Sequence, residues 1–494
     1  MFKLKLHPVS ALINCVKALK DMAIPIVIIF VANGFNFTLN FRDERFFSQM
    51  IPLFILVVAL IFTFVSGILK WWTFRYWFED SELRVEYGLF VKKKRYIPFD
   101  RIQSLNYKEG IFHRIFGLVQ VLVETAGSKD GKPEAQLTAI TRAAADQIEQ
   151  EMNKAKMRGR VETEVTDGMI QPQGRVIHKM SPKDLIVLAT TSSGIGVVIF
   201  GVFAVISQFA EYIPFEWIYD EFSHLVKYSI ALIIGLIFIG VLGAWIISVA
   251  LTLLNYFDFT VTEENDRLVI TRGLLEKKRI TIPLNRVQAI KIVENPLRQP
   301  FGLATVQVES AGGGFAEGKD KKIVLFPLIS KKQAMEPLAA LFPQFQFQLE
   351  EQQMIRPPRR ARPFFYRIDF LWLIPLMIVP SYVFYPYGLL SLLLVIPVIL
   401  LGIWQHKTAR FQVHGSQLTI IYRQISRVTF CVEKSRIQVT EQRQSYFQKR
   451  KQVATGQVVV MSGMTGAKAN AYHMEQRDIE ALMHWYEYKK TSEE

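Results

Sequence analysis

Ile97-Pro98-Phe99-Asp100-Arg101-Ile102-Gln103, followed by Phe116-Gly117-Leu118, is a stretch that the chain repeats about 185 residues later as Ile282-Pro283-Leu284-Asn285-Arg286-Val287-Gln288 and Phe301-Gly302-Leu303. From Gly88 to Gly127, about 17 of 40 positions match the second copy without a gap. Such identity predicts one supersecondary unit that is duplicated within the chain. A weaker third copy keeps Arg436-Ile437-Gln438 but has Gln452-Val453-Ala454 in place of Phe-Gly-Leu.

Each copy follows a pair of apolar runs of membrane length. The chain has 494 residues and 37 Phe, and its mean hydropathy of +0.19 is too high for a purely soluble protein of this size. A helix needs about 20 apolar residues to cross the hydrocarbon of a bilayer. Six runs approach that length, near 22–41, 51–72, 185–208, 227–254, 369–386 and 388–405. The last two are short and share Pro386-Tyr387-Gly388, which favours one tight hairpin over one broken helix.

The charges beside these runs predict how they are oriented. The net charge is +15, and basic clusters at 154–183 and 356–367 precede the third and fifth runs. The segment 211–221 between the third and fourth runs is acidic instead. The positive-inside rule therefore predicts that the N-terminus, the soluble domains and the C-terminus are cytoplasmic. No small-residue cleavage pattern follows the first run, so we expect it to remain in the mature protein.

After each hairpin the apolar pattern changes to period two, which is typical of strands. In the second copy Phe257, Phe259 and Val261 alternate, and Ser330 is a suitable N-cap for a closing helix. Strands followed by one helix, in about 80 residues, predict a bent antiparallel sheet or partial barrel that the helix plugs. The expected division is an N-terminal segment with hairpin 1 (1–72), domain 1 (73–155), a basic linker (156–184), hairpin 2 (185–254), domain 2 (255–350), an Arg-rich linker (351–368), hairpin 3 (369–405) and a divergent domain 3 (406–494).

The repeated motif behind a two-span hairpin resembles the type 2 bacterial pleckstrin-homology-like (PH-like) domain. The arrangement of three such domains with three hairpins resembles the YdbT family of bacterial membrane proteins. The resemblance implies a PH-like fold in each domain, an antiparallel β-barrel or sandwich of seven strands with a C-terminal helix. It also implies a location in the bacterial cell (inner) membrane. It implies little about function, because the fold hosts many binding roles.

Two basic strands occupy the same place in the first two copies. They are candidate contacts to anionic lipid headgroups, at roughly 1 kcal/mol per basic residue near the bilayer surface. The alternative is a solvated edge strand whose lysines prevent edge-to-edge pairing. The residues are Lys92, Lys93, Lys94 and Arg95 in the first copy and Lys277, Lys278 and Arg279 in the second.

An arginine-rich run before the fifth apolar stretch is a second candidate for lipid contact. Pro357 and Pro358 favour an extended chain there, within a Debye length of the headgroups. The alternative is that these charges only set the topology. The arginines are Arg356, Arg359, Arg360 and Arg362.

The remaining repeated residues are expected to be structural. We expect each Arg of the Arg-x-Gln element to form an ion pair or a hydrogen-bonded corner within its own domain, with the Pro fixing the turn before it. The Gly of Phe-Gly-Leu is expected to need a special backbone angle. The residues are Pro98, Arg101, Gln103 and Gly117 in the first copy, and Pro283, Arg286, Gln288 and Gly302 in the second.

Motifs for catalysis or cofactor binding are absent from the sequence. Gly313 to Lys319 spells the skeleton of a phosphate-binding loop, but Asp320 stands where Ser or Thr should follow and no helix begins there. The eight histidines and two cysteines, Cys15 and Cys431, show no metal-binding spacing. The apolar runs carry no charged residue near their centres. We therefore expect no enzyme, no cofactor and no metal.

The sequence favours a membrane-bound binding or scaffold protein. Its expected partners are anionic membrane lipids, and a homo-oligomer is possible. The family resemblance adds a smaller single-domain PH-like membrane protein as a partner, and protection against membrane-active peptides as a role. The alternative class is a transporter or lipid-handling protein that uses the six-helix bundle. Nucleic-acid binding is not expected, because the positive charge lies at membrane borders where the positive-inside rule explains it.

Overall fold

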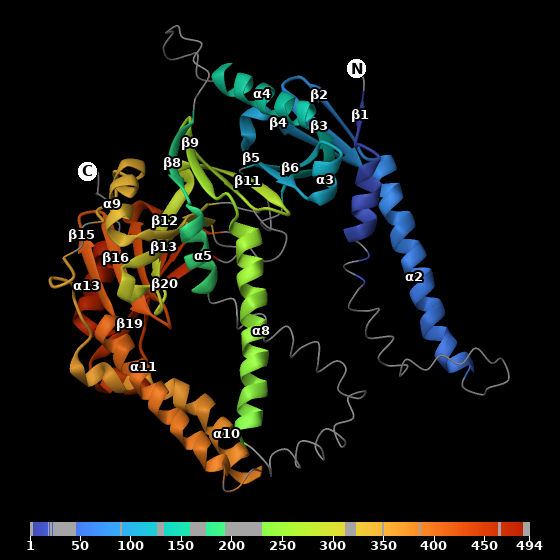
Figure 1. The fold of residues 1–494 in the computed structure, drawn as a ribbon. Coiled ribbons are helices and arrows are strands. Elements are labelled where there is room, and N and C mark those ends of the chain that lie inside the picture. Colours follow the sequence, from blue (N-terminus) through green and yellow to red (C-terminus); the bar gives the residue numbers. More distant parts are fainter. Residues whose placement is uncertain are drawn as a thin grey trace, which may run out of the picture.

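Three β-rich modules lie at one side of the molecule, and long apolar helices extend from them in a common direction (Figure 1). The computed structural model describes residues 3–17, 19, 22, 46–88, 91–125, 133–158, 174–192, 230–311, 323–347, 350–383, 385, 387–462 and 466–487. The expected first run, 22–41, lies outside the described residues except for Met22, and most of the third, 185–208, also lies outside them.

Among the described residues, three helical segments are long and apolar enough to cross a bilayer. These are Phe54–Thr73 in α2 (Phe46–Thr73), Phe238–Tyr256 in α8 (Ile230–Tyr256), and Gly388–Thr408, which joins the 3₁₀ segment η7 (Tyr387–Leu394) to α11 (Val395–Thr408). They match the second, fourth and sixth expected runs. The fifth forms α10 (Arg367–Val383), which contains a shorter apolar stretch, Leu373–Tyr382. Ser391 Oγ donates to Met377 O at 3.0 Å, so α10 and η7 lie side by side as a tight hairpin.

Within the described part of the chain, each module has six strands after its apolar helix and ends in a helix. Module 1 contains β2 (Arg75–Glu79), β3 (Glu82–Tyr87), β4 (Lys93–Pro98), β5 (Ile102–Glu109), α3 (Ile111–Ile115), β6 (Leu118–Thr125), β7 (Ala135–Thr141) and α4 (Arg142–Arg158). Module 2 contains β9 (Thr260–Glu264), β10 (Arg267–Arg272), β11 (Lys277–Pro283), β12 (Val287–Glu294), β13 (Leu303–Ser310), β14 (Ile323–Ser330) and α9 (Lys331–Leu341). Module 3 contains β15 (Arg410–His414), β16 (Gln417–Arg423), β17 (Arg427–Glu433), β18 (Ile437–Arg443), α12 (Tyr446–Arg450), β19 (Val453–Val460), β20 (Ala467–Glu475) and α13 (Gln476–Tyr486).

The sheets do not stop at module boundaries. The order β7-β6-β5-β11-β10-β9-β8 joins the second half of module 1 to the first half of module 2. The order β14-β13-β12-β17-β16-β15 joins module 2 to module 3 in the same way. The outer halves form the separate sheets β1-β2-β3-β4 and β18-β19-β20. The barrel or sandwich that was expected for each domain is thus a sandwich of two sheets, and neighbouring modules share a sheet.

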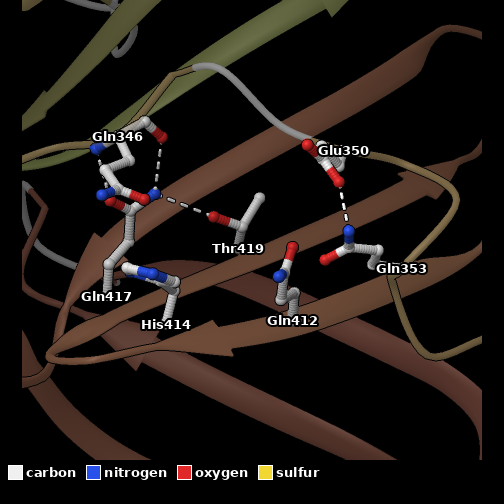
Figure 2. Close-up of a pocket in the computed structure, with 7 residues that line it drawn as sticks. All are labelled: Gln346, Glu350, Gln353, Gln412, His414, Gln417 and Thr419. Carbon is white, nitrogen blue, oxygen red and sulfur yellow. Dashed lines mark hydrogen bonds between the residues drawn. The ribbon is translucent and has the colours of Figure 1, made fainter.

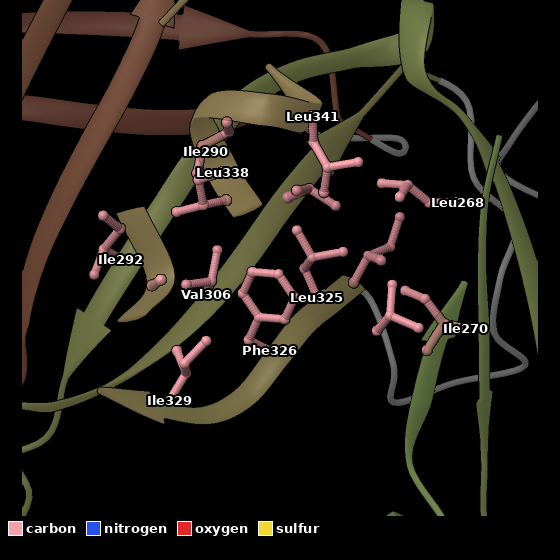
Figure 3. Close-up of a cluster of buried hydrophobic side chains, with 14 of the residues drawn as sticks. Leu268, Ile270, Ile290, Ile292, Val306, Leu325, Phe326, Ile329, Leu338 and Leu341 are labelled. Atoms are coloured by element: carbon pink, nitrogen blue, oxygen red, sulfur yellow. The ribbon is translucent and has the colours of Figure 1, made fainter. Parts of the chain in front are cut away.

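The core of module 2 fills the space between its two sheets and α9 (Figure 3). Ile290 and Ile292 of β12 point into this core, whereas Ala289, which precedes them, belongs to the core of module 3. Alternate side chains of a strand face opposite sides of a sheet. The shared sheet therefore separates two cores, and β12 carries buried residues on both faces.

A short strand before each apolar pair bonds to the first strand after it. β1 (Leu4–Lys5) pairs with β2, β8 (Arg175–Lys179) pairs with β9, and Ile355 forms an isolated bridge to Phe411. The expected basic linker 156–184 thus contains a sheet strand and the start of α5 (Pro182–Thr190). The Arg-rich linker 351–368 likewise holds the 3₁₀ segment η6 (Arg359–Phe365).

Candidate functional site: the module junctions and basic surfaces

The first junction pairs β5 with β11 over three residues. Glu109 lies opposite Lys277, Lys108 opposite Lys278, and Tyr107 opposite Arg279. Beyond these three pairs, the Thr281 amide donates to a side-chain oxygen, Asn106 Oδ1, at 3.0 Å instead of to a backbone carbonyl. Asn106 is 3% exposed, so this bond between modules is shielded from water.

Ion pairs surround the first junction. Glu276 lies 3.1 Å from Lys108 and 3.3 Å from Lys278, and therefore bridges two lysines that face each other across the strands. Arg279 lies 3.1 Å from Glu264 in its own module and 3.8 Å from Glu149 on α4 of module 1. Lys278 and Arg279 thus form ion pairs within the protein.

The position of β11 contradicts the edge-strand interpretation of the second basic strand. A solvated edge strand was one of its two expectations, but β11 pairs with β10 on one side and β5 on the other. Its lysines cannot serve to protect an edge. Lys277, at the start of the strand, is exposed and faces Glu109.

A buried carboxylate connects the repeated motif to the first junction. Glu124 accepts from Ser104 Oγ at 2.9 Å and from Asn106 Nδ2 at 3.2 Å. Burial raises the pKa of Glu124, although these two bonds and the charge of Arg286 oppose the rise. Arg286 belongs to module 2, so its electrostatic partner lies in the preceding module. This corrects the expectation that an ion pair of Arg286 would lie within its own domain.

The second junction is longer and is closed by a network of charges. β12 and β17 pair over six residues, from Ala289 opposite Val432 to Glu294 opposite Arg427. Arg427 lies 3.5 Å from Glu294 and also bonds to Glu351. Arg410 is 3.0 Å from Glu351, and Lys331 is 3.6 Å from it. Burial opposes ionisation, but these three cations hold the pKa of Glu351 below its usual value.

The two junctions have the same register. By the repeat, Glu109 corresponds to Glu294 and Lys277 corresponds to Arg427. Each pair is directly opposed across its junction. The modules are therefore related by one recurring contact. The sequence signal for it was an acidic residue at the end of one strand and a basic residue at the start of another, both repeated.

Among the described strands, the first basic strand, β4, lies at the edge of its sheet, as the edge-strand interpretation predicts. β4 pairs with β3, and Lys92, Lys93 and Lys94 are exposed. Arg95 instead lies 3.3 Å from Glu134 and stacks over Tyr87, with its guanidinium carbon 5.8 Å from the ring centroid. The three lysines are available to an external partner, and Arg95 is partly engaged within module 1.

The arginine-rich run is extended only as far as Pro358. The 3₁₀ segment η6 begins at Arg359, which corrects the expectation that the two prolines keep the whole run extended. A proline before a helix is compatible with its start, because the restriction acts on the residue that precedes the proline. Arg360 donates to Lys451 O at 2.8 Å and bonds to Glu475. Arg356, Arg359 and Arg362 are exposed.

The repeated turn residues adopt the geometry that the motif predicts. Gly117 and Gly302 have φ of 63° and 64°, and Gln452, their counterpart in module 3, has φ of 53°. Pro98 and Pro283 precede 3₁₀ turns that end at Arg101 and Arg286. Gln288 Nε2 donates to Arg286 O at 3.0 Å, which closes the second turn. Gln103 occupies the corresponding position in module 1.

Exposed apolar loops lie beside the ends of the long helices, which the sequence reading missed. The Leu274 amide donates to Leu254 O in the last turn of α8, at 2.9 Å. Leu275 next to it is 47% exposed. In module 3, Gln405 of α11 donates to Gln424 O at 3.0 Å, and Ile425 is 67% exposed. These two loops lie beside the C-terminal ends of α8 and α11, where these helices join their modules.

A polar pocket of about 240 Å³ lies on module 3 (Figure 2). Its lining is Gln346, Glu350, Gln353, Gln412, His414, Gln417 and Thr419. Gln417 exchanges two hydrogen bonds with the backbone of Gln346, at 2.7 and 3.0 Å, and also donates to Thr419. The side-chain amide of Gln417 is thus hydrogen-bonded to the backbone of Gln346. It connects the segment before the Arg-rich linker to β16. Among the residues that the structure describes, no cluster of His, Cys, Asp or Glu could hold a metal.

Comparison with known proteins agrees with this architecture. The model of the bacterial PH domain family matches residues 24–156, 184–342 and 370–490. The chain is 36% identical over 503 aligned positions to the UPF0699 transmembrane protein YdbT of Bacillus subtilis (strain 168), covering 99% of this chain and 98% of the relative. No solved structure matches the chain. With three matches that span most of its length, the chain belongs to the bacterial PH domain family, as a membrane protein similar to YdbT.

Proposed function

We propose that the protein is a multi-pass scaffold of the bacterial cell membrane. In this proposal six helices form three hairpins, and the three modules form one platform on the cytoplasmic surface. The platform binds anionic lipid headgroups and a smaller single-domain PH-like membrane protein. It contributes in this way to resistance against membrane-active peptides.

The pairing of strands across each apolar pair carries the proposal. β1 and β8 precede an apolar pair and bond to the strand that follows it, and Ile355 does the same. The intervening chain must therefore leave the module and return to it, which requires an even number of membrane crossings. Two crossings fit the lengths of the apolar runs. The basic flanks then favour a cytoplasmic position for all three modules.

The exposed apolar loops that contain Leu275 and Ile425 support contact with the bilayer. Leu275 and Ile425 are exposed beside helices that are long enough to span it. Apolar side chains at this level gain free energy by entering the interfacial region, at about 25 cal/mol per Å² of surface removed from water. Lys277 begins the strand that follows Leu275, so cationic and apolar groups are adjacent there. This combination is typical of surfaces that bind anionic membranes.

The test places an environment-sensitive fluorophore on single cysteines in full-length protein. L275C and I425C are compared with V176C, a similarly exposed position in β8, after reconstitution into nanodiscs. We expect blue-shifted emission at the first two positions and not at the third. A second arm replaces Lys92, Lys93 and Lys94 with Gln and measures the phosphatidylglycerol that co-purifies, which should fall relative to the wild type. Equal emission at all three positions, with unchanged lipid, would contradict a platform that contacts the bilayer.

The partner and the role are tested in cells. Affinity purification from native membranes should recover a smaller PH-like membrane protein, and deletion of the gene should increase sensitivity to a membrane-active peptide. Recovery of no such protein, together with unchanged sensitivity, would refute this part of the proposal.

A further inference from the structure

The series of shared sheets ends in two strand edges that have no partner among the described residues. β18 pairs with β19, and β4 pairs with β3, each on one side only within the described part of the chain. By the repeat, β18 corresponds to β5 and β12, each of which pairs with a strand of the next module. β4 corresponds to β11 and β17, each of which pairs with a strand of the previous module. Module 3 therefore carries one half of a junction, and module 1 carries the other half.

Side chains at these edges are exposed where their counterparts are buried. Val439 of β18 is 51% exposed, but its counterpart Ala289 is fully buried in the second junction. Tyr96 of β4 is 54% exposed, whereas its counterparts Thr281 and Cys431 are buried. An open strand edge with exposed apolar side chains is a template for pairing with another chain.

We propose that β18 of one chain pairs antiparallel with β4 of a second copy, in the register of the two internal junctions. That register places Val439 opposite Ile97, Glu441 opposite Arg95, and Gln442 opposite Lys94. The contact adds a strand to an exposed edge through main-chain hydrogen bonds, a common mode of recognition. It extends the proposed scaffold role, but it depends on the strand edges and not on lipid binding.

We assign a second copy of this chain as the partner. Each chain carries both strands of a junction, β18 and β4, whose counterparts already pair twice within the chain. Glu441 and Arg95 also provide opposite charges at facing positions, although Glu441 already bonds to Arg443 and Arg95 to Glu134 within the chain. The contact is heterologous, since the two surfaces differ, so it extends into a row of molecules unless the rotation closes it into a ring. All copies in such a row keep their apolar helices in the same membrane.

The charges make this contact weaker than the internal ones. Gln444 occupies the position of Glu109 and Glu294, so Lys92 would face an uncharged residue. Arg443 would face Lys93, as Lys108 faces Lys278, but the bridging Glu276 has Val91 as its counterpart. Like charges opposite each other across strands are destabilising. The association is therefore reversible, and it depends on protein density in the membrane and on salt.

Disulfide cross-linking between two differently tagged full-length chains tests the proposal. One chain carries Q442C and the other K94C, and only the product that bears both tags is counted after mild oxidation in membranes. The native Cys15 and Cys431 are buried. As a matched control, K449C on α12 replaces Q442C, because it is also exposed but lies outside the strand.

We expect the Q442C/K94C product to exceed the K449C/K94C product at least fivefold. Adding R443E to the first chain should raise the yield, E441K should lower it, and R450E should leave it unchanged. Equal yields for Q442C and K449C would overturn the proposal. It would also be overturned if Q442C cross-linked mainly to another Q442C, or if in native membranes it cross-linked only to a different protein.

Discussion

Asn106 is the side chain whose loss should weaken the first junction most selectively. Replacing it with Leu keeps the approximate volume but removes the acceptor of the Thr281 amide and one donor to Glu124. A buried polar group without its partner costs about 1–3 kcal/mol. Both groups can relax in part, so we expect Asn106→Leu to destabilise the junction by about 3 kcal/mol.

The assay is hydrogen exchange of the full-length protein in detergent, read by mass spectrometry. Because 1.4 kcal/mol corresponds to a factor of ten, the amides of 277–283 should exchange roughly 100-fold faster in the variant. The peptide 427–433 in the second junction should be unchanged. Asn470→Leu is the matched control, since Asn470 bonds to Gln457 and Tyr472 inside module 3. Unchanged exchange at 277–283, or equal acceleration at both junctions, would refute the reasoning.

Four further predictions follow from the backbone, the buried carboxylate and the flanking charges. Gln452→Gly should stabilise module 3 by about 1 kcal/mol in thermal unfolding, because Gly adopts a positive φ without strain; a lower melting temperature would contradict this. Gly117→Val should cost module 1 about 1–3 kcal/mol through its backbone alone, since no atom lies within 4 Å of an added Cβ; unchanged melting would count against it. The raised pKa of Glu124 means that the stability linked to its protonation is full below the usual Glu pKa and is lost as the pH rises through the folded-state value. Glu124→Gln should therefore melt increasingly above the wild type as the pH rises from 4 to 8, and a constant difference would exclude this linkage. Reporter fusions after Asp220 should be external and those after Gly127 and Gly463 cytoplasmic, and the reverse pattern would invert the topology.

The repeat and the turns of the fold were predictable because they depend on local chemistry. The positive φ of Gly117 and Gly302 follows from an apolar-Gly-apolar turn, and the helix ends at Thr73, Tyr256 and Thr408 follow from the lengths of the apolar runs. Residues close in sequence determine these features. The strands that follow the hairpins were predictable for the same reason.

The junctions could not be predicted, because they pair strands that are far apart in the sequence. Lys278 and Arg279 read as a lipid site or a protected edge, and only the position of β5 shows that they face Lys108 and Tyr107. Asn106 gives no signal of its own, since a polar residue in a strand normally faces water. β12 mixes apolar residues with Gln288, Lys291 and Glu294, so its sequence does not identify the strand of module 3 that pairs with it.

The central claim is that the modules form one platform on the cytoplasmic surface through shared sheets. The most direct test is a disulfide between K108C and K278C, which lie directly opposite each other across β5 and β11. Cross-strand neighbours have Cα separations of about 4.5–5.5 Å, within the range of a disulfide. A specific protease site is inserted within 160–172, and the oxidised protein is treated in inside-out membrane vesicles and in intact protoplasts. We predict cleavage only in the vesicles, with the two fragments held together until a reductant is added. Cleavage in protoplasts, or fragments that separate without reductant, would contradict the account.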